Sequence, residues 1–406
     1  MSEIVQITGL GAEGDGAATT AAGEQIFVPQ ALPGETWRVE EGYAPEPVTL
    51  LPERRRAPNA DDEPCGGCVA RHMPLAMYEA WKREFLVRAL RQSRIELDVQ
   101  PLITVPEHSR RRATFNARRM KGAMHIGYHG RRSHDLVAAE DCPVLDRRIV
   151  ELLPALAHLA AIAAGQEEVA RVAITLTDTG ADIDVEGNER ALNAAARAKI
   201  GEITASAKLA RVSVGGVPVI ERQKPVLHFA GKAVTPPPGT FLQAVPEAER
   251  VMIDLVTSSL GKAKLVGDLF CGLGTLTLPI AQKARVMAFD ADRNAIAALD
   301  EALRKNQGLK PTTTRARDLY HDALSPMEMK DLDAVVLDPP RAGAKAQCER
   351  LAQSKVKRVV MVSCNPATLA RDLRILIDGG YRLDAVTPID QFLYSPHLEA
   401  VAVLTR

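Results

Sequence analysis

From residue 264 onward, short apolar, β-rich runs alternate with segments of helical pattern. The runs lie at Lys264–Phe270, Arg285–Asp290, Asp333–Asp338, Arg358–Ser363 and Leu398–Leu404. This alternation predicts a doubly wound, mostly parallel sheet, because helices cover both faces of its buried strands. Thr235-Pro236-Pro237-Pro238-Gly239 precedes the runs, and consecutive prolines neither continue a helix nor donate to a ladder. We therefore expect an α/β domain over residues 236–406.

Two further parts precede that break. Residues 1–53 hold short β-branched runs between Gly and Pro clusters, which predicts a small β-barrel. Residues 54–235 begin with a polar linker, continue with an amphipathic helix near Met73–Ile95, and mix strand-like runs with an Ala-rich helix near 148–164. We expect a central α+β domain there.

The composition is that of an ordinary globular protein. Lys and Arg together number 51, as do Asp and Glu, so net charge predicts no partner. No run approaches the ~20 apolar residues of a membrane span, and the first residues lack the layout of a signal peptide. We expect a cytoplasmic protein with no membrane contact, and a monomer by default. Its six cysteines are too scattered for a disulfide scaffold, which leaves thiols or metal ligands.

A glycine turn, Gly272-Leu273-Gly274, follows the first run of the α/β domain and precedes a helix near 276–282. In open α/β sheets ligands bind at the carboxyl ends of strands, where glycine lets the backbone approach them. The second run ends at Asp290, 18 residues after Gly272, where a carboxylate can accept from two ribose hydroxyls. Thr277 replaces the third glycine of the dinucleotide fingerprint. S-adenosylmethionine (SAM) is therefore favoured over a nicotinamide dinucleotide.

Three reactive side chains are expected at the same edge of the sheet. Asp338 and Cys364 each end a run, and Glu399 begins the last one. Taken singly, Asp338 suits a turn cap and Cys364 a small buried thiol. Beside a cofactor site these residues together indicate a catalytic role. A cysteine near a helix N-terminus is expected to have a lowered pKa.

A nucleophilic cysteine, a carboxylate base and a methyl donor suit methylation of a carbon that is not itself nucleophilic, such as C5 of uracil. Addition of the Cys364 thiolate to C6 makes an enolate whose C5 accepts the methyl group. Glu399 then removes the C5 proton, and elimination frees the cysteine. The target base has to be unstacked or flipped to reach such a pocket.

These motifs in this order resemble the bacterial RNA uridine-5-methyltransferase family, whose members act on 23S ribosomal RNA or on the T-loop of transfer RNA. The resemblance covers essentially the whole chain and implies Cys364 as nucleophile and Glu399 as proton acceptor. It implies SAM contacts from Gln243, Phe270, Thr275, Asp290, Asp318 and Asp338. The first fifty residues are similar to the family's small RNA-binding barrel, called TRAM, and the central part to its substrate-clasping insert.

A basic segment indicates RNA binding independently of that resemblance. From His108 to His134 the chain has seven Arg and Lys121, no Asp or Glu, and two interleaved aromatic residues, Phe115 and Tyr128. A local charge of +8 in a neutral chain predicts phosphate binding, with aromatic surface for stacking. A solvated basic face is the alternative.

Cys65, Cys68 and Cys142 are similar to the iron–sulfur ligands of the family's ribosomal members, in which four cysteines hold a four-iron cluster. The fourth position, six residues before Cys65, is Asn59 in this chain. We favour a [4Fe-4S] cluster. A zinc site that includes a histidine such as His72, or no cluster at all, are the alternatives.

The cysteines and the barrel favour 23S ribosomal RNA over transfer RNA as the substrate. Three other readings stay open at this point: a transfer RNA uridine-5-methyltransferase, a SAM- and RNA-binding factor without catalysis, and a nicotinamide-linked oxidoreductase. The sequence does not identify the uridine.

Overall fold

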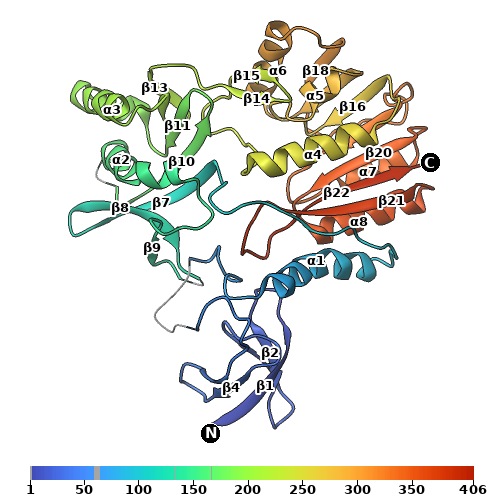
Figure 1. Cartoon of the computed structure of the whole chain (residues 1–406). Coiled ribbons are helices and arrows are strands. Elements are labelled where there is room, and N and C mark those ends of the chain that lie inside the picture. Colours follow the sequence, from blue (N-terminus) through green and yellow to red (C-terminus); the bar gives the residue numbers. More distant parts are fainter. Residues whose placement is uncertain (1, 59–64, 132, 166) are drawn as a thin grey trace.

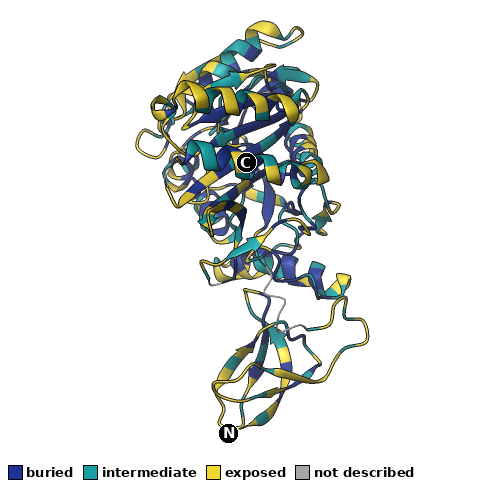
Figure 2. Cartoon of the chain, turned by 90° about the vertical axis from the view of Figure 1, so that its left-hand side faces the viewer, coloured by how far each residue is buried: buried dark blue, intermediate teal, exposed yellow. Residues whose placement is uncertain are grey.

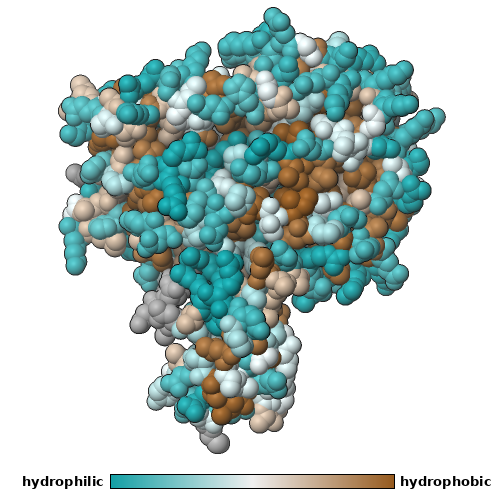
Figure 3. All heavy atoms as spheres, viewed as in Figure 1, coloured by the Kyte–Doolittle hydropathy of each residue, from teal (hydrophilic) through white to brown (hydrophobic). Residues whose placement is uncertain are grey.

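The structure, a computed structural model, describes residues 2–58, 65–131, 133–165 and 167–406. Figure 1 shows three lobes, of which the N-terminal one projects from the other two. This N-terminal lobe is an antiparallel sheet with the strand order β3-β2-β1-β4-β5. Its strands are β1 (Glu3–Leu10), β2 (Gly16–Thr19), β3 (Gln25–Val28), β4 (Thr36–Val39) and β5 (Glu46–Thr49). Val5, Ile7 and Trp37 lie in its small core, and Figure 3 shows how little of the molecule surrounds this lobe.

The C-terminal lobe is an eight-stranded sheet with the order β18-β17-β16-β19-β20-β22-β21-β6. Its strands are β6 (Ile103–Thr104), β16 (Leu265–Leu269), β17 (Arg285–Asp290), β18 (Thr312–Ala316), β19 (Ala334–Leu337), β20 (Arg358–Ser363), β21 (Arg382–Asp390) and β22 (Glu399–Thr405). The first five strands in the order are mutually parallel, and β22 is antiparallel to both of its neighbours. Parallel strands need helical crossovers, which fits the alternation in the sequence.

Helices cover both faces of this sheet. One face packs against α4 (Pro246–Ser259), α5 (Thr277–Ala281) and α6 (Arg293–Lys305). The other packs against α1 (Leu75–Gln92), α7 (Lys345–Ala352) and α8 (Pro366–Asp378). Figure 2 shows the buried strands in dark blue between helices whose outer faces are exposed. The predicted doubly wound α/β class is confirmed.

The sheet recruits segments from the part of the chain that we assigned to a central domain. Helix α1 packs on one face, and β6 pairs with β21 at the edge. The hairpin of β14 (Leu227–Phe229) and β15 (Lys232–Val234) also contributes to the C-terminal core, through Leu227, Phe229 and Val234. The hairpin therefore packs with the C-terminal lobe, although it precedes the domain boundary that we predicted after residue 235.

The central lobe is a seven-stranded sheet with the order β13-β12-β11-β10-β7-β8-β9. Its elements are β7 (Arg112–Met120), β8 (Ala123–His129), β9 (Leu136–Ala138), α2 (Arg147–Ala163), β10 (Val169–Thr177), β11 (Gly180–Val185), the short 3-10 helix η1 (Glu189–Ala191), α3 (Ala194–Ser206), β12 (Arg211–Val214) and β13 (Val217–Glu221). Helices α2 and α3 pack on one face and share its core. In the described part of the chain, no helix is both long and apolar enough to cross a membrane.

Candidate active site

A cavity of about 540 Å³ opens where the parallel strands of the C-terminal sheet end. The two predicted catalytic residues and the six predicted cofactor residues all line it: Gln243, Phe270, Thr275, Asp290, Asp318, Asp338, Cys364 and Glu399. They come from segments after β16, β17, β18, β19 and β20, from the start of β22, and from the segment before α4. Because carboxyl ends of parallel strands meet at one edge, residues far apart in the sequence share one cavity.

The glycine turn shapes one end of this cavity. Gly272 donates its backbone N–H to Asp290 Oδ2 at 2.8 Å, which ties the turn to the end of β17. Gly274 has φ +87°, and a Cβ there would lie 2.4 Å from Leu299 Cδ1 of α6, so only glycine allows this close packing. Phe270, also in the left-handed region at φ +64°, lies with its ring 5.5 Å from that of Tyr320.

Around the glycine turn, the described residues leave an acceptor and open space for the cofactor predicted from the sequence. Asp268 is buried beside the turn; Thr277 donates to its Oδ2 at 2.5 Å, and its Oδ1 has no hydrogen-bond partner among the described residues. A buried, unpartnered carboxylate oxygen is costly unless a ligand completes it. Space is also open above Gly272, where an added Cβ would meet nothing within 4 Å.

Cys364 and Glu399 are brought together by strand register. Ser363, the last residue of β20, pairs with Ala400 of β22, so Cys364, which follows β20, and Glu399, the first residue of β22, lie at the same end of these two strands. Asn365 caps α8 by accepting from Ala367 N at 3.1 Å, and its Nδ2 donates to the carbonyl of Arg341 at 3.2 Å. The cysteine is thereby fixed between a strand end and a capped helix.

The pKa of Cys364 differs from our expectation. Burial, followed by the carboxylates of Glu399 and Asp338, raises the pKa of the thiol to about 11, although α8 begins directly after it. Burial and Asp338 raise the pKa of Glu399 to about 8, and burial raises that of Asp338 to about 7. The lowered thiol pKa that we expected is wrong for this structure, because desolvation and nearby negative charge outweigh the helix N-terminus.

Sequence reasoning missed Gln391, a buried carboxamide in this site. It follows β21 and hydrogen bonds to both Gln243 and Glu399. A polar residue directly after a strand was the available signal, but β21 itself was not predicted. Asp268, the last residue but one of β16, was also missed as a site residue, and so was the Tyr320 ring that packs on Phe270.

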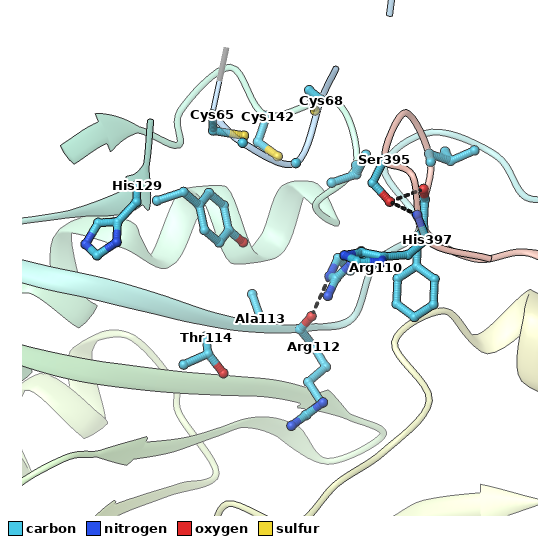
Figure 4. A pocket seen from close by; sticks show the side chains of 16 residues that line it. Cys65, Cys68, Arg110, Arg112, Ala113, Thr114, His129, Cys142, Ser395 and His397 are labelled. Carbon is cyan, nitrogen blue, oxygen red and sulfur yellow. Dashed lines mark hydrogen bonds between the residues drawn. The ribbon is translucent and has the colours of Figure 1, made fainter. Parts of the chain in front are cut away.

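A second cavity, of about 420 Å³, contains the three predicted metal ligands. Figure 4 shows Cys65, Cys68 and Cys142 together on one side of it, with Arg110 and Arg112 on the other. A hydrogen bond from Cys68 lowers the pKa of the Cys65 thiol to about 6, whereas burial raises the pKa of Cys142. Phe392 lines both this cavity and the first one.

The geometry of the cysteines does not suit a single metal ion. Among the described residues, no group of three or more His, Cys, Asp or Glu side chains is arranged to hold one ion. His72, the proposed zinc partner, does not line the cavity; burial lowers its pKa to about 4. Asn59 lies outside the described residues. A four-iron cluster places less demand on the spacing, because each thiolate binds its own iron.

The basic segment 108–134 is not one uniform surface. Arg111 forms an ion pair of 2.6 Å with Glu249 of α4, and Arg131 forms two bonds of 2.7 Å with Asp15 of the N-terminal lobe. Both pairs are largely shielded from solvent and connect lobes. Two of the predicted phosphate-binding cations are therefore occupied by structural ion pairs.

Successive residues of the basic segment on β7 point to opposite faces of the central sheet. Phe115 is buried in the core of the central lobe, so the expectation that it offers stacking surface is wrong, because every second residue of a strand faces the core. Thr114 and Arg118 are exposed, on the face that carries no helix. Arg118, His129 and Arg171 line one groove on that face. Arg132 lies outside the described residues.

Comparison with known proteins places the chain among RNA methyltransferases. A family model for tRNA (uracil-5-)-methyltransferases matches residues 237–406. An uncharacterized RNA methyltransferase of Brucella suis biovar 1 is 44% identical over 406 residues, which cover 99% of this chain and 97% of that protein. The 23S rRNA (uracil(1939)-C(5))-methyltransferase RlmD of Pectobacterium atrosepticum is 31% identical over 408 residues, which cover 94% of this chain and 89% of that protein.

A solved structure shares the whole fold. The tRNA (uracil-54, C5)-methyltransferase of Pyrococcus abyssi, in complex with S-adenosyl-L-homocysteine, superposes with a TM-score of 0.76 and covers 100% of both chains. Its sequence identity to this chain is 22%, so the likeness concerns the fold alone.

Proposed function

This chain belongs to the RNA (uracil-5-)methyltransferase family, with SAM as methyl donor, and on that premise we propose that it methylates C5 of a uridine in 23S ribosomal RNA through a covalent Cys364 adduct. One observation carries the covalent mechanism. Cys364 and Glu399 lie at the same end of the adjacent strands β20 and β22 and line the cavity that also holds the predicted cofactor residues.

The roles of the chain's own residues follow from that arrangement. SAM, when bound, supplies an electrophilic methyl group. Cys364 Sγ bonds to C6 of uracil, and the π electrons of the C5–C6 bond move to make C5 nucleophilic. After C5 has accepted the methyl group, Glu399 takes the C5 proton, the C5–C6 double bond re-forms, and the C6–S bond breaks to release the thiolate. Because the pKa values of Cys364 and Glu399 lie above neutrality, we expect the transfer rate to rise between pH 7 and 9.

The helix-free face of the central sheet is the proposed path for the RNA. Arg112 lines the cysteine cavity, and Arg118 and Arg171 line the groove farther along the same face. Cations along one open face can follow a phosphate backbone. We propose the N-terminal sheet as a further, TRAM-like RNA contact. The preference for 23S ribosomal RNA rests on the name of the Pectobacterium relative and on the three clustered cysteines.

Nucleoside mass spectrometry tests this proposal. Ribosomal and transfer RNA from a strain that lacks the gene would be analysed before and after incubation with pure protein and SAM. We expect 5-methyluridine to be absent from 23S RNA and restored by the protein. Restoration in transfer RNA alone would overturn the substrate assignment. Cys364→Ala should bind SAM but transfer no methyl group, and retained turnover would remove Cys364 from the mechanism.

We also propose that Cys65, Cys68 and Cys142 hold a [4Fe-4S] cluster. Their shared cavity and soft thiol donors support it. Anaerobically purified protein should contain about four iron atoms and absorb near 400 nm, and Cys68→Ala should lose both signals. Zinc, or no metal, in wild-type protein would contradict this assignment and leave the methylation proposal intact.

A further inference from the structure

Gln391 occupies the centre of a hydrogen-bond network beside the proposed base. Its side chain is buried and makes three contacts at once. Ala244 N donates to its Oε1 at 3.2 Å, and its Nε2 donates to Gln243 Oε1 at 2.7 Å and to Glu399 Oε1 at 2.9 Å.

The direction of this network is determined by its backbone member. A backbone N–H can only donate, so the Gln391 oxygen has to face Ala244 and its amino group has to face Gln243 and Glu399. Gln243 must then turn its oxygen toward Gln391, which leaves its Nε2 directed at Asp338 Oδ2, 3.4 Å away. One backbone amide therefore sets the orientation of two carboxamides and provides Glu399 with a donor.

Helix α1 holds the loop that carries Gln391. Lys82 Nζ forms a fully buried ion pair of 2.7 Å with Asp390, the residue before Gln391. The same ammonium donates to the carbonyls of Phe392 at 3.1 Å and Ser395 at 2.9 Å, and also to that of His397. A single cation thus binds both the start and the end of the loop. This fixes the position of Gln391 relative to Glu399.

We infer that Gln391 is a positioning residue, whose carboxamide orients Gln243 and stabilises the carboxylate form of Glu399 for removal of the C5 proton. The inference rests on the role of Glu399 in the proposed function. Glu399 is buried and close to Asp338, so its ionised form needs a donor. The Gln391 amino group is the hydrogen-bond donor that the described residues provide to it.

Gln391→Met and Gln391→Glu separate this role from packing. Met keeps the volume but makes none of the three hydrogen bonds. Glu keeps the acceptor for Ala244 but has no amino group for Glu399. Gln347→Met is the matched control, because Gln347 is an equally buried carboxamide that bonds the backbone of Leu324 away from the cavity. Single-turnover methyl transfer is measured from pH 6 to 10, and SAM affinity by calorimetry.

Both Gln391 variants should transfer methyl groups about tenfold more slowly at pH 7, and the acidic limb of the profile should move up by about one pH unit. Both variants should keep a single cooperative thermal unfolding transition, which shows that they are folded, and they should bind SAM more weakly because Gln243, a proposed SAM contact, loses its orientation. Gln347→Met should lose thermal stability and keep the wild-type profile. Superposition of the Gln391 and wild-type profiles would overturn the inference. Unchanged turnover in Glu399→Gln would instead overturn the role of Glu399 in the proposed function.

Discussion

At the scale of single residues, the site concentrates buried carboxyl groups. Asp268, Asp338 and Glu399 line one cavity, and desolvation raises the pKa of each, to about 7, 7 and 8. Few cations offset them there. Buried acids of this kind oppose folding once they ionise, which is a common cost of a functional site.

Glu399→Gln should therefore stabilise the protein, and more so at high pH. The folded pKa of Glu399 is raised, so its contribution to stability is complete below the unfolded pKa near 4.5 and is lost as pH rises through about 8. Removing the charge should increase the unfolding free energy by about 3 kcal/mol more at pH 9 than at pH 6. Chemical denaturation at both pH values measures this. An equal gain at the two pH values would contradict the pKa shift, and Glu301→Gln, at a partly exposed glutamate of α6 that pairs with Lys305, is the control.

Single residues also show what the sequence could and could not predict. That Cys364, Asp338 and Glu399 lie at one edge of the sheet could be predicted because strand ends can be located from apolar runs. The pKa of Cys364 and the role of Gln391 depend on side chains that are remote in the sequence, such as Gln243 and Glu399. Contacts between residues on different strands leave no recognisable pattern in the sequence around either residue.

At the scale of elements, the strands that were predicted are the buried ones. Strands β19 and β20 are almost entirely apolar, and their predicted ranges agree with the structure to within a residue. Strand β18, with the sequence Thr-Thr-Thr-Arg-Ala, lies at the sheet edge and is half exposed, so it lacks an apolar run. Strand β21 mixes polar and apolar residues because its first half faces solvent. An edge position hid β18, and the solvent-facing first half of β21, which β6 does not pair, hid that strand; weak β propensity hid neither.

Gly274→Ala tests the turn between β16 and α5. An added methyl group would meet Leu299 at 2.4 Å, on a backbone with φ +87°. We expect a loss of about 3 kcal/mol in unfolding free energy, together with weaker SAM binding, because α6 has to move away from the turn. Gly261→Ala is the control, since its φ is +59° but the nearest atom is the flexible Arg358 side chain at 3.5 Å. That variant should lose about 1 kcal/mol and keep its SAM affinity.

At the scale of the molecule, three sheets are joined by a few buried ion pairs. Arg111 joins the central lobe to α4, and Arg131 joins it to the N-terminal lobe. The arginines that remain on the helix-free face are the ones available to a polyanion. A neutral chain can therefore present a local RNA-binding surface that its net charge does not reveal.

Arg118→Ala and Arg171→Ala should each weaken RNA binding without affecting the cofactor. We expect about a tenfold loss of affinity for the double variant at low salt. The slope of log affinity against log salt concentration should fall by about one for each arginine, because each removes one phosphate contact. Filter binding to a 23S fragment at several salt concentrations measures both effects. Arg382→Ala, an exposed arginine at the opposite end of β21 from the active site, is the control. An unchanged salt slope in the double variant would exclude this face as the RNA path.

The contact between Lys82 and the loop after β21 also constrains how the protein is made. These partners are 310 residues apart in the chain. During translation α1 leaves the ribosome long before the loop is synthesised. Its apolar face and the Lys82 ammonium group therefore lack their final partners for a time, and long-range contacts of this kind favour slow folding and chaperone binding. Glu399 makes its bond to Gln391 only after β22 has been synthesised, so the proposed active site is incomplete in any shorter nascent chain.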